Sequence, residues 1–273
     1  MHFCETVKPI QHERFIAIKK AKSMQMKKIM LITGSSRCIG AATALLAARE
    51  GYTVAVNYRT NKSAAEAIVS KIRESGGAAV AIQADISQPD EIVRLFSETD
   101  RLLGRFDALV NNAGILEKQM RLVDMDAMRL KRVFTTNVIG QFLCTQEAVK
   151  RMSTKHGGNG GSIVNVSSLA ARTGSPNEYL DYAASKGALD TFTVGLSKEV
   201  ATEGIRVNAV RPAFIYTDIH AAGGEPNRVE RLKDSIPMQR GGFAEEVAEA
   251  ILWLVSEKSS YTTGTFIEIS GGK

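Results

Sequence analysis

The stretch TGSSRCIG, residues 33–40, directly follows the apolar run IMLIT at residues 29–33 and precedes the alanine-rich stretch AATALLAA at residues 41–48. A buried strand, a tight turn that contains glycines and a following helix predict the opening of a βαβ unit. The first turn of such a helix presents free backbone N–H groups and the positive end of the helix dipole. The stretch therefore predicts a pyrophosphate site, although glycines would also suit an ordinary turn between a strand and a helix.

Short β-branched runs alternate with longer amphipathic segments about every 25 to 30 residues along the rest of the chain, the rhythm of consecutive βαβ units. The predicted strands are continuously apolar, which is typical of a parallel sheet covered on both faces; they span residues 29–33, 53–57, 78–83, 108–111, 162–167, 206–210 and 265–269. Apolar residues at a spacing of three to four predict helices, among them residues 63–74, 90–103, 128–152, 182–203 and 245–257. We therefore expect one doubly wound α/β domain, residues 27–273, with a seven-stranded parallel sheet and helices on both faces.

One long segment interrupts this rhythm. Residues 217–242 contain the sequence AAGGEP and a second glycine pair, Gly241 and Gly242. Connections of this length inside a compact domain are usually functional. We expect an active-site lid here.

The charge distribution separates the chain into a basic extension and a nearly neutral body. The formal net charge is +6, and residues 1–27 carry six Lys and Arg but only two Glu. This predicts a basic, solvated N-terminal extension at residues 1–26 and a body without the positive surface that nucleic-acid binding requires. The longest uninterrupted apolar run, AILWLV at residues 250–255, has six residues, well short of the roughly 18 that a membrane span needs, so we expect no membrane insertion.

The cysteines bear on the compartment and on metals. Cys4, Cys38 and Cys144 are odd in number and lack the spacing of a metal site. We therefore expect no metal and a reducing cytoplasm.

Polar residues that could perform chemistry follow the predicted strands. Asn111-Asn112-Ala113-Gly114 ends the fourth strand, Ser167-Ser168 ends the fifth, and Tyr182-Ala183-Ala184-Ser185-Lys186 opens the helix after it. Residues four apart on a helix share a face, so Tyr182 and Lys186 can point into one site. A phenol with a pKa of about 10 becomes a useful acid or base when a cation stabilises its phenolate. Each residue alone is commonplace at the end of an element, so the prediction depends on the set.

This combination resembles the short-chain dehydrogenase/reductase family over almost all of residues 28–273, and is most similar to the bacterial subgroup of glucose 1-dehydrogenases and 3-oxoacyl-carrier-protein reductases. The resemblance implies a Rossmann-type sheet, an NAD(P)(H) cofactor and a homotetramer or homodimer. It also implies that Tyr182 is the general acid/base and that Ser168 orients the substrate. Lys186 is implied to bind the ribose and to adjust the pKa of Tyr182. Asn137 matches the asparagine that holds a water for proton relay.

Two neighbouring residues are alternatives within this motif. Tyr179 precedes Tyr182 by three residues but has Ala183, rather than a lysine, four residues later, so it is expected in the pocket wall. Ser167 and Ser168 point to opposite faces of a strand, and the position in the motif favours Ser168.

The end of the second predicted strand indicates the cofactor. NAD enzymes place an acidic residue there for the ribose hydroxyls, whereas a 2′-phosphate requires cations. Asn57-Tyr58-Arg59 contains no acid and Arg37 adds a cation, so NADP(H) is favoured, NAD(H) is possible, and Arg59 could also be a solvated turn residue. Asp85 matches an aspartate beside the adenine and could equally cap the next helix. The predicted cofactor-binding residues are Gly34, Ser36, Arg37, Ile39, Gly40, Asn57, Arg59, Asp85, Ile86, Asn112, Ala113, Gly114, Tyr182, Lys186, Pro212, Ile215 and Thr217.

Two positions depart from the family pattern. Cys38 replaces the second glycine of the turn, and Ala213 replaces a glycine beside the expected nicotinamide site. We expect Cys38 to be tolerated with the negative φ of a helix start. The helix dipole and Arg37 are expected to lower the pKa of its thiol.

The sequence thus predicts an NAD(P)(H)-dependent oxidoreductase that transfers hydride between nicotinamide and a small-molecule secondary alcohol or carbonyl compound. A non-catalytic dinucleotide-binding regulator on the same fold is the alternative, and the complete set of Asn137, Ser168, Tyr182 and Lys186 argues against it. Three segments of variable sequence, residues 115–121, 169–179 and 217–241, are expected to wall the substrate pocket.

Overall fold

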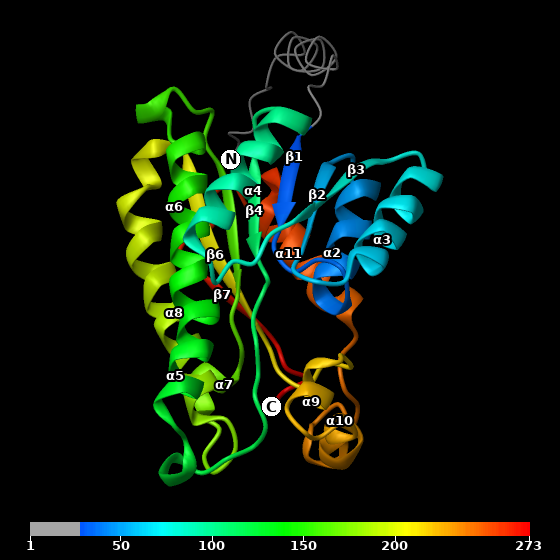
Figure 1. The fold of residues 1–273 in the computed structure, drawn as a ribbon, viewed down its shortest axis with the longest axis vertical. Helices are drawn as coiled ribbons and strands as arrows, with labels where there is room; N and C mark the ends of the chain where they lie inside the picture. The colour runs from blue at the N-terminus through cyan, green and yellow to red at the C-terminus, as the bar shows by residue number, and fades with distance from the viewer. Residues whose placement is uncertain (1–27) are drawn as a thin grey trace, which may run out of the picture.

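Seven parallel strands form one sheet, in the order β3-β2-β1-β4-β5-β6-β7, in a computed structural model that describes residues 28–273 (Figure 1). The strands are β1 (Ile29–Ile32), β2 (Thr53–Tyr58), β3 (Ala78–Gln83), β4 (Ala108–Asn111), β5 (Gly161–Val166), β6 (Ile205–Pro212) and β7 (Phe266–Ile269). Their bounds lie within two residues of the predicted ones, and the predicted doubly wound α/β fold is confirmed. The predicted basic extension, residues 1–26, lies outside the described residues.

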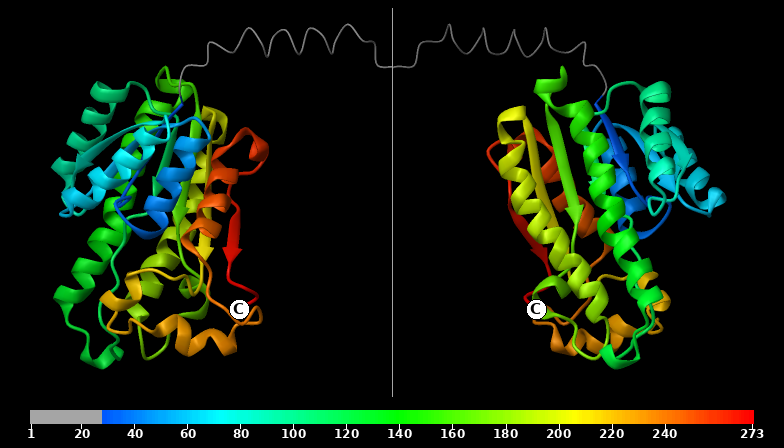
Figure 2. Two further views of the ribbon diagram at one scale, coloured as in Figure 1. Left: turned by 90° about the vertical axis from the view of Figure 1, so that its right-hand side faces the viewer. Right: turned by 60° about the vertical axis from the view of Figure 1, so that its left-hand side comes forward.

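Helices cover both faces of this sheet, as the two views of Figure 2 show. Apolar side chains of α2 (Cys38–Arg49), α3 (Lys62–Glu74) and α11 (Ala244–Val255) pack on one face around Ile32, Val56 and Val110. Side chains of α4 (Pro89–Leu103), α6 (Gly140–Met152) and α8 (Leu180–Glu199) pack on the other around Leu31, Leu109 and Val207. Alternate residues of the central strands thus supply two separate cores, which explains their continuous apolar sequence.

The predicted helix at residues 128–152 is two helices joined by a wider turn. α5 (Ala127–Phe134) passes into a π-helical turn, η2 (Thr135–Ile139), before α6 begins. Within this turn the buried residue is the polar Asn137, whereas Ile139 is exposed, so the spacing of apolar residues does not reveal it. Single π-helical turns are frequent at functional sites, and this one carries Asn137.

The carboxyl edge of the sheet is where the chain order reverses. β1 pairs with β2 on one side and with β4 on the other, so the connections after β1 and β4 leave toward opposite faces and open a crevice between them. Three short helices lie beyond this edge: α7 (Ala170–Thr173), α9 (Ile219–Ala222) and α10 (Arg228–Leu232) (Figure 1). The last two belong to the predicted lid at residues 217–242.

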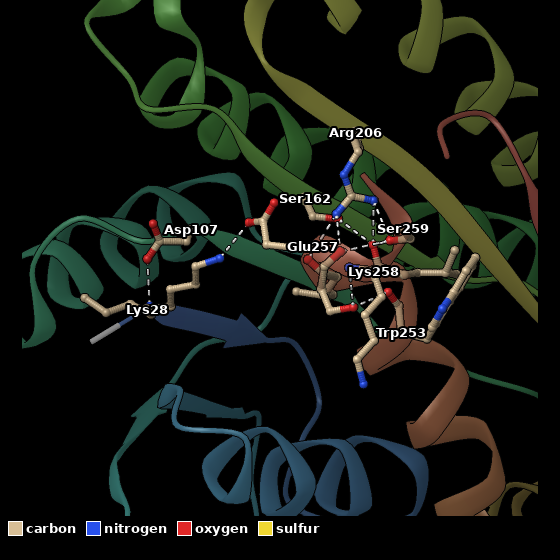
Figure 3. Close-up of polar contacts among 12 residues, drawn as sticks. Lys28, Asp107, Ser162, Arg206, Trp253, Glu257, Lys258 and Ser259 are labelled. Carbon is tan, nitrogen blue, oxygen red and sulfur yellow. Dashed lines mark hydrogen bonds and ion pairs between the residues drawn. The ribbon is translucent and has the colours of Figure 1, made fainter. Parts of the chain in front are cut away.

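The opposite edge of the sheet is fixed by an arginine that caps α11 (Figure 3). Half-buried Arg206, on β6, donates from Nη1 to the Leu254 carbonyl at 2.7 Å and from Nη2 to the Val255 carbonyl at 3.0 Å. Carbonyls in the last turn of a helix lack partners within the helix. The guanidinium supplies those partners and joins the end of α11 to the sheet.

Candidate active site

The glycine turn after β1 packs directly against the ends of β2 and β4. Gly34 has φ +62°, a left-handed conformation that favours glycine, and a Cβ added there would lie 3.0 Å from Ala113 Cα. Its N–H donates to Asn57 Oδ1 at 3.0 Å, and Asn112 Nδ2 donates to its carbonyl at 3.0 Å. These contacts hold the turn so that the N-terminus of α2 points into the crevice.

Cys38 does not have the negative φ that we expected. Its φ is +50°, one of four positive values among the non-glycine residues in 28–273. The prediction was wrong because Cys38, the first residue of α2, follows the extended Arg37 with a left-handed φ, a conformation that glycine adopts without strain. Ala213 is not one of the four, so its replacement of a glycine demands no left-handed backbone.

The predicted shift of the Cys38 pKa is also wrong in direction. Burial raises the pKa of the Cys38 thiol above its ordinary value, and the Asp218 carboxylate beside it adds to this effect. Asp218 Oδ2 lies 3.5 Å from Sγ. The lid that brings this anion against the thiol is far away in the sequence, so only the structure reveals the effect.

One cleft of about 900 Å³ extends from the glycine turn to the lid along the carboxyl edge of the sheet. Its walls include Ser168 and every predicted cofactor-binding residue except Gly40, which is buried at the start of α2. The predicted residues in the walls are Gly34, Ser36, Arg37, Ile39, Asn57, Arg59, Asp85, Ile86, Asn112, Ala113, Gly114, Tyr182, Lys186, Pro212, Ile215 and Thr217. A cleft of this size, lined by the N-terminus of α2 and by the buried Lys186, fits a dinucleotide.

Two of these residues support the walls through their side chains. Besides its bond from Gly34, Asn57 donates from Nδ2 to the Ala84 carbonyl at 3.1 Å. Asp85 Oδ1 accepts from the Ser87 N–H at 2.9 Å, and Gln88, not Asp85, is the N-cap residue of α4. The proposed cap role of Asp85 is therefore wrong.

Two exposed arginines line the cleft, Arg59 just after β2 and Arg37 in the glycine turn after β1. Arg37 Nη1 lies 3.7 Å from Asp218 Oδ2. An exposed pair at this distance contributes little stability, so both guanidinium groups stay available to an anion.

Tyr182 and Lys186 also line the cleft, on the first turns of α8. The Lys186 ammonium lies 5.6 Å from the centre of the Tyr182 ring and donates to the Val166 carbonyl at 2.7 Å. Burial lowers the pKa of Lys186 to about 8, and the Asp190 carboxylate one turn further along α8 acts against this shift. Burial raises the pKa of Tyr182 to about 12, whereas a hydrogen bond with Ser168 favours its ionised form.

Asn137 lies behind this pair, held by the π-helical turn. Its Oδ1 accepts from the Ile115 N–H at 2.8 Å, and its Nδ2 donates to the Ile115 carbonyl at 2.9 Å and to Ser185 Oγ at 3.1 Å. A Cβ added at Gly114 would lie 3.4 Å from Asn137 Oδ1 and 3.6 Å from Lys186 Nζ. The fold therefore gathers Asn137, Lys186 and Tyr182 around the end of β4.

The structure separates the two pairs of alternatives. Both serines border the cleft, but the buried Ser167 donates from Oγ to Asp190 Oδ1 at 2.5 Å, whereas Ser168 forms the hydrogen bond with Tyr182. Tyr179 is buried in the cleft wall, where its hydroxyl donates to the Gly223 carbonyl at 3.1 Å. Tyr182 and Ser168 are thus the pair that contact each other in the cleft.

Three further polar residues line the substrate end of the cleft: Glu178, His220 and Arg228. They lie in the segments predicted to wall the pocket, but no motif singled them out. Arg228 ion-pairs with Glu178 and with Glu225 and lies over the Tyr179 ring, 5.1 Å from its centre. Polar side chains in a lid are ordinarily expected to be exposed to solvent, yet Arg228 and His220 are both buried. These contacts close the lid over the segment that leads into α8.

A doubly wound sheet with a tyrosine and a lysine one turn apart at the switch-point crevice defines a Rossmann-type oxidoreductase. A family model described as enoyl-(acyl carrier protein) reductase matches residues 34–273. The chain belongs to the short-chain dehydrogenase/reductase family, whose members bind nicotinamide nucleotide cofactors.

Relatives extend over nearly the whole chain. The uncharacterized oxidoreductase YgfF of Escherichia coli K12 is 61% identical over 245 residues, 90% of this chain and 99% of its own. The 3-oxoacyl-[acyl-carrier-protein] reductase FabG of Staphylococcus aureus Mu50 is 38% identical over 249 residues, 91% of this chain and 99% of its own. The crystal structure of acetoin dehydrogenase YohF from Salmonella typhimurium matches with a TM-score of 0.80 and 35% identity, covering 90% of this chain and 96% of that one.

Among the helices within residues 28–273, none has the length and apolar character that a membrane crossing requires.

Proposed function

We propose that this protein is an NADP(H)-preferring oxidoreductase that interconverts a small secondary alcohol and the corresponding carbonyl compound. The observation that carries the proposal is the meeting of Tyr182, Lys186 and Ser168 at one end of a cleft whose other end fits a nucleotide. A bound nicotinamide would accept or supply the hydride. The residues of the chain bind and orient the substrate and the cofactor, and they move the proton.

Tyr182 is the proposed proton carrier. Its phenol gives a proton to the substrate oxygen during reduction, and its phenolate takes the proton of the substrate hydroxyl during oxidation. With a pKa raised to about 12 by burial, its phenolate is scarce at neutral pH. With a pKa of about 8, Lys186 carries a positive charge at pH 7 and stabilises the phenolate from one helical turn away. Ser168 donates a hydrogen bond to the same substrate oxygen.

The cofactor preference follows from the adenosine end of the cleft. No carboxylate follows β2, because Asn57, Tyr58 and Arg59 occupy the end of the strand and the turn after it. Arg59 and Arg37 supply two cations for a 2′-phosphate, and each charge-assisted bond favours it by about 1.5 to 3 kcal/mol. NADPH should therefore bind more tightly than NADH.

Self-association is the proposed assembly. Met128, Leu130, Ile139 and Phe142 expose apolar side chains on α5, η2 and α6. Trp253 on α11 and Phe243 before it expose a second apolar set on the other face of the sheet. Two separate self-contacting surfaces are what a tetramer with dihedral symmetry needs, and one suffices for a dimer.

The two described cysteines, Cys38 and Cys144, are free thiols, which supports a reducing cytoplasm.

A purified-enzyme screen tests the proposed reaction. NADPH and NADH are each incubated with a panel of hydroxyketones, diketones, 3-oxoacyl thioesters and sugars, and nicotinamide absorbance reports turnover. Turnover of at least one carbonyl compound by wild type, with a loss of about 100-fold to 10,000-fold in Tyr182→Phe at unchanged NADPH affinity, supports the proposal. NADPH binding without turnover across the panel favours the non-catalytic regulator.

A further inference from the structure

A buried ion pair joins α5 to the turn of α8 that carries the proposed proton carrier. Arg129 Nε donates to Asp181 Oδ2 at 2.7 Å, and Arg129 Nη2 donates to Asp181 Oδ1 at 3.1 Å. The two side chains are only 4% and 1% exposed. Asp181 immediately precedes Tyr182. We propose that Arg129 and Asp181 are positioning residues that set the place of the Tyr182 hydroxyl in the cleft; this inference rests on the proposed function.

Besides Arg129, two polar side-chain contacts hold the start of α8: Asn137 donates to Ser185, and Arg228 ion-pairs with Glu178 just before the helix. Its N-cap residue, Tyr179, forms no side-chain cap with any residue in 28–273. The segment that enters the helix contains Ser175 with φ +44° and Asn177 with φ +62°. Left-handed backbone at non-glycine residues costs energy. Of the polar contacts at the start of α8, the two parallel hydrogen bonds to Asp181 act on the residue next to Tyr182 and are directional.

Arg129 also reaches the predicted wall of the substrate pocket. Its Nη1 donates to the Lys118 carbonyl at 2.6 Å, within residues 115–121. The same wall segment is joined to the lid, because the Gln119 N–H donates to the Gly223 carbonyl at 3.2 Å. Asp126 caps α5 by accepting from the Arg129 N–H at 2.7 Å. One guanidinium thus connects α5, the pocket wall and the helix of Tyr182.

Stability alone does not explain a charged pair at this place. Removing two charges from water is costly, and apolar residues of similar volume often give an equal or higher free energy of unfolding. Breaking only one partner is strongly destabilising because the other charge is left buried. An apolar pair cannot reproduce the directional hydrogen bonds that fix the Asp181 carboxylate relative to the Arg129 guanidinium. An apolar double variant therefore separates folding from positioning.

The experiment compares this double variant, Arg129→Met with Asp181→Leu, with each single substitution. The double variant should keep its Tm within a few degrees of wild type and its NADPH affinity within about twofold. Its kcat should fall about 10-fold to 100-fold, because a misplacement of about 1 Å at a reacting group costs roughly that much. A crystal structure should show the Tyr182 hydroxyl displaced by about 1 Å relative to Lys186 Nζ.

The single variants distinguish the two contacts of Arg129. Asp181→Asn keeps the bond from Arg129 to the Lys118 carbonyl, so kcat should fall while the KM for the carbonyl substrate stays within about twofold. Arg129→Met removes both contacts, so kcat should fall and KM should rise. Arg151→Met is the matched control, because Arg151 forms ion pairs with Asp100 at 2.7 Å and Glu147 at 2.6 Å on helices away from the cleft. It should lower Tm and leave kcat unchanged.

Two results would overturn the inference. A double variant with wild-type kcat would make the pair purely structural. An unmoved Tyr182 hydroxyl in its crystal structure would do the same, and this readout does not depend on turnover. Failure of the proposed function is recognised separately, by wild-type turnover that survives Tyr182→Phe or by a wild type that reduces no carbonyl compound.

Discussion

Cys38 Sγ lies 3.5 Å from Asp218 Oδ2 and accepts the Asp218 N–H at 3.4 Å, so the glycine turn after β1 touches the first residues of the lid. The two residues are 180 positions apart in the sequence. A glycine at position 38 would lack the side chain that makes this contact. The cofactor cleft and the lid are thereby connected through a thiol.

Cys38→Gly should raise both the stability and the cofactor affinity. Glycine adopts a φ of +50° without strain, whereas cysteine does not. The substitution should therefore raise the free energy of unfolding by about 1 kcal/mol, after the greater entropy of glycine in the unfolded chain is subtracted. It also removes a side chain from the expected pyrophosphate site. Thermal unfolding and NADPH titration measure the two effects. Cys38→Ala is the control, because it keeps a Cβ at the same φ and should gain neither; equal behaviour of the two variants would remove this explanation.

The Cys38 thiol should react slowly with iodoacetamide at pH 7. Because burial and Asp218 raise its pKa, the reactive thiolate is rarer than for an ordinary thiol, and the rate should increase steeply as pH rises. Asp218→Asn should accelerate labelling at fixed pH, and NADPH should protect the thiol in both proteins. Mass spectrometry of the modified peptide measures the rate. Fast labelling at pH 7 would show that the thiolate is stabilised after all.

Arg59→Ala should weaken NADPH binding by about one to two orders of magnitude, which corresponds to the loss of one charge-assisted bond. NADH binding should stay nearly unchanged. Arg49→Ala is a suitable control, because Arg49 is an exposed cation at the far end of α2. Fluorescence titration gives the four dissociation constants. Equal losses for both cofactors would assign Arg59 a structural role.

Lys186→Met should stabilise the fold in a way that depends on pH. The buried ammonium has a pKa of about 8, below its ordinary value of 10.5. Below pH 8 the lysine is charged in both the folded and the unfolded state, so its burial costs free energy of folding. Between pH 8 and 10.5 the folded protein loses the proton first, and wild-type stability recovers. The advantage of Lys186→Met should therefore be greatest below pH 8 and shrink above it.

Denaturant unfolding at several pH values measures this difference. Lys198→Met serves as control, because Lys198 is an exposed lysine of the same helix. A stability difference for Lys186→Met that does not change with pH would contradict the assigned shift.

Arg206→Met should destabilise the protein by roughly 3 kcal/mol, because carbonyls at the end of α11 lose buried partners. The expected signs are a lower Tm and an unchanged kcat for the folded fraction, since Arg206 lies at the amino end of β6, whereas the cleft lies at the carboxyl ends of the strands. Lys258→Met, an exposed neighbour, should have little effect. A large loss of kcat in folded Arg206→Met would show that the cap also acts on the site.

Local patterns in the sequence determined the strands, most helices and the core of the candidate site. Apolar runs mark strands covered on both faces, and a spacing of four places Tyr182 and Lys186 on one side of a helix. Asn112 directly follows β4 and Ser168 lies two residues after β5, so the parallel sheet alone brings them to the same edge. These relationships involve neighbours in the chain or the ends of adjacent strands, and for that reason they can be predicted.

Tertiary structure decided the contacts between distant segments. Arg129 and Asp181 are 52 positions apart, and each alone is typical of an exposed helix face. The lid buries Arg228 between acidic partners and brings Asp218 against Cys38. Burial and long-range charge set pKa values, which explains why the expected direction for Cys38 was wrong. The sequence by itself specified which chemistry could be present, whereas packing between distant segments decided how that chemistry is held and tuned.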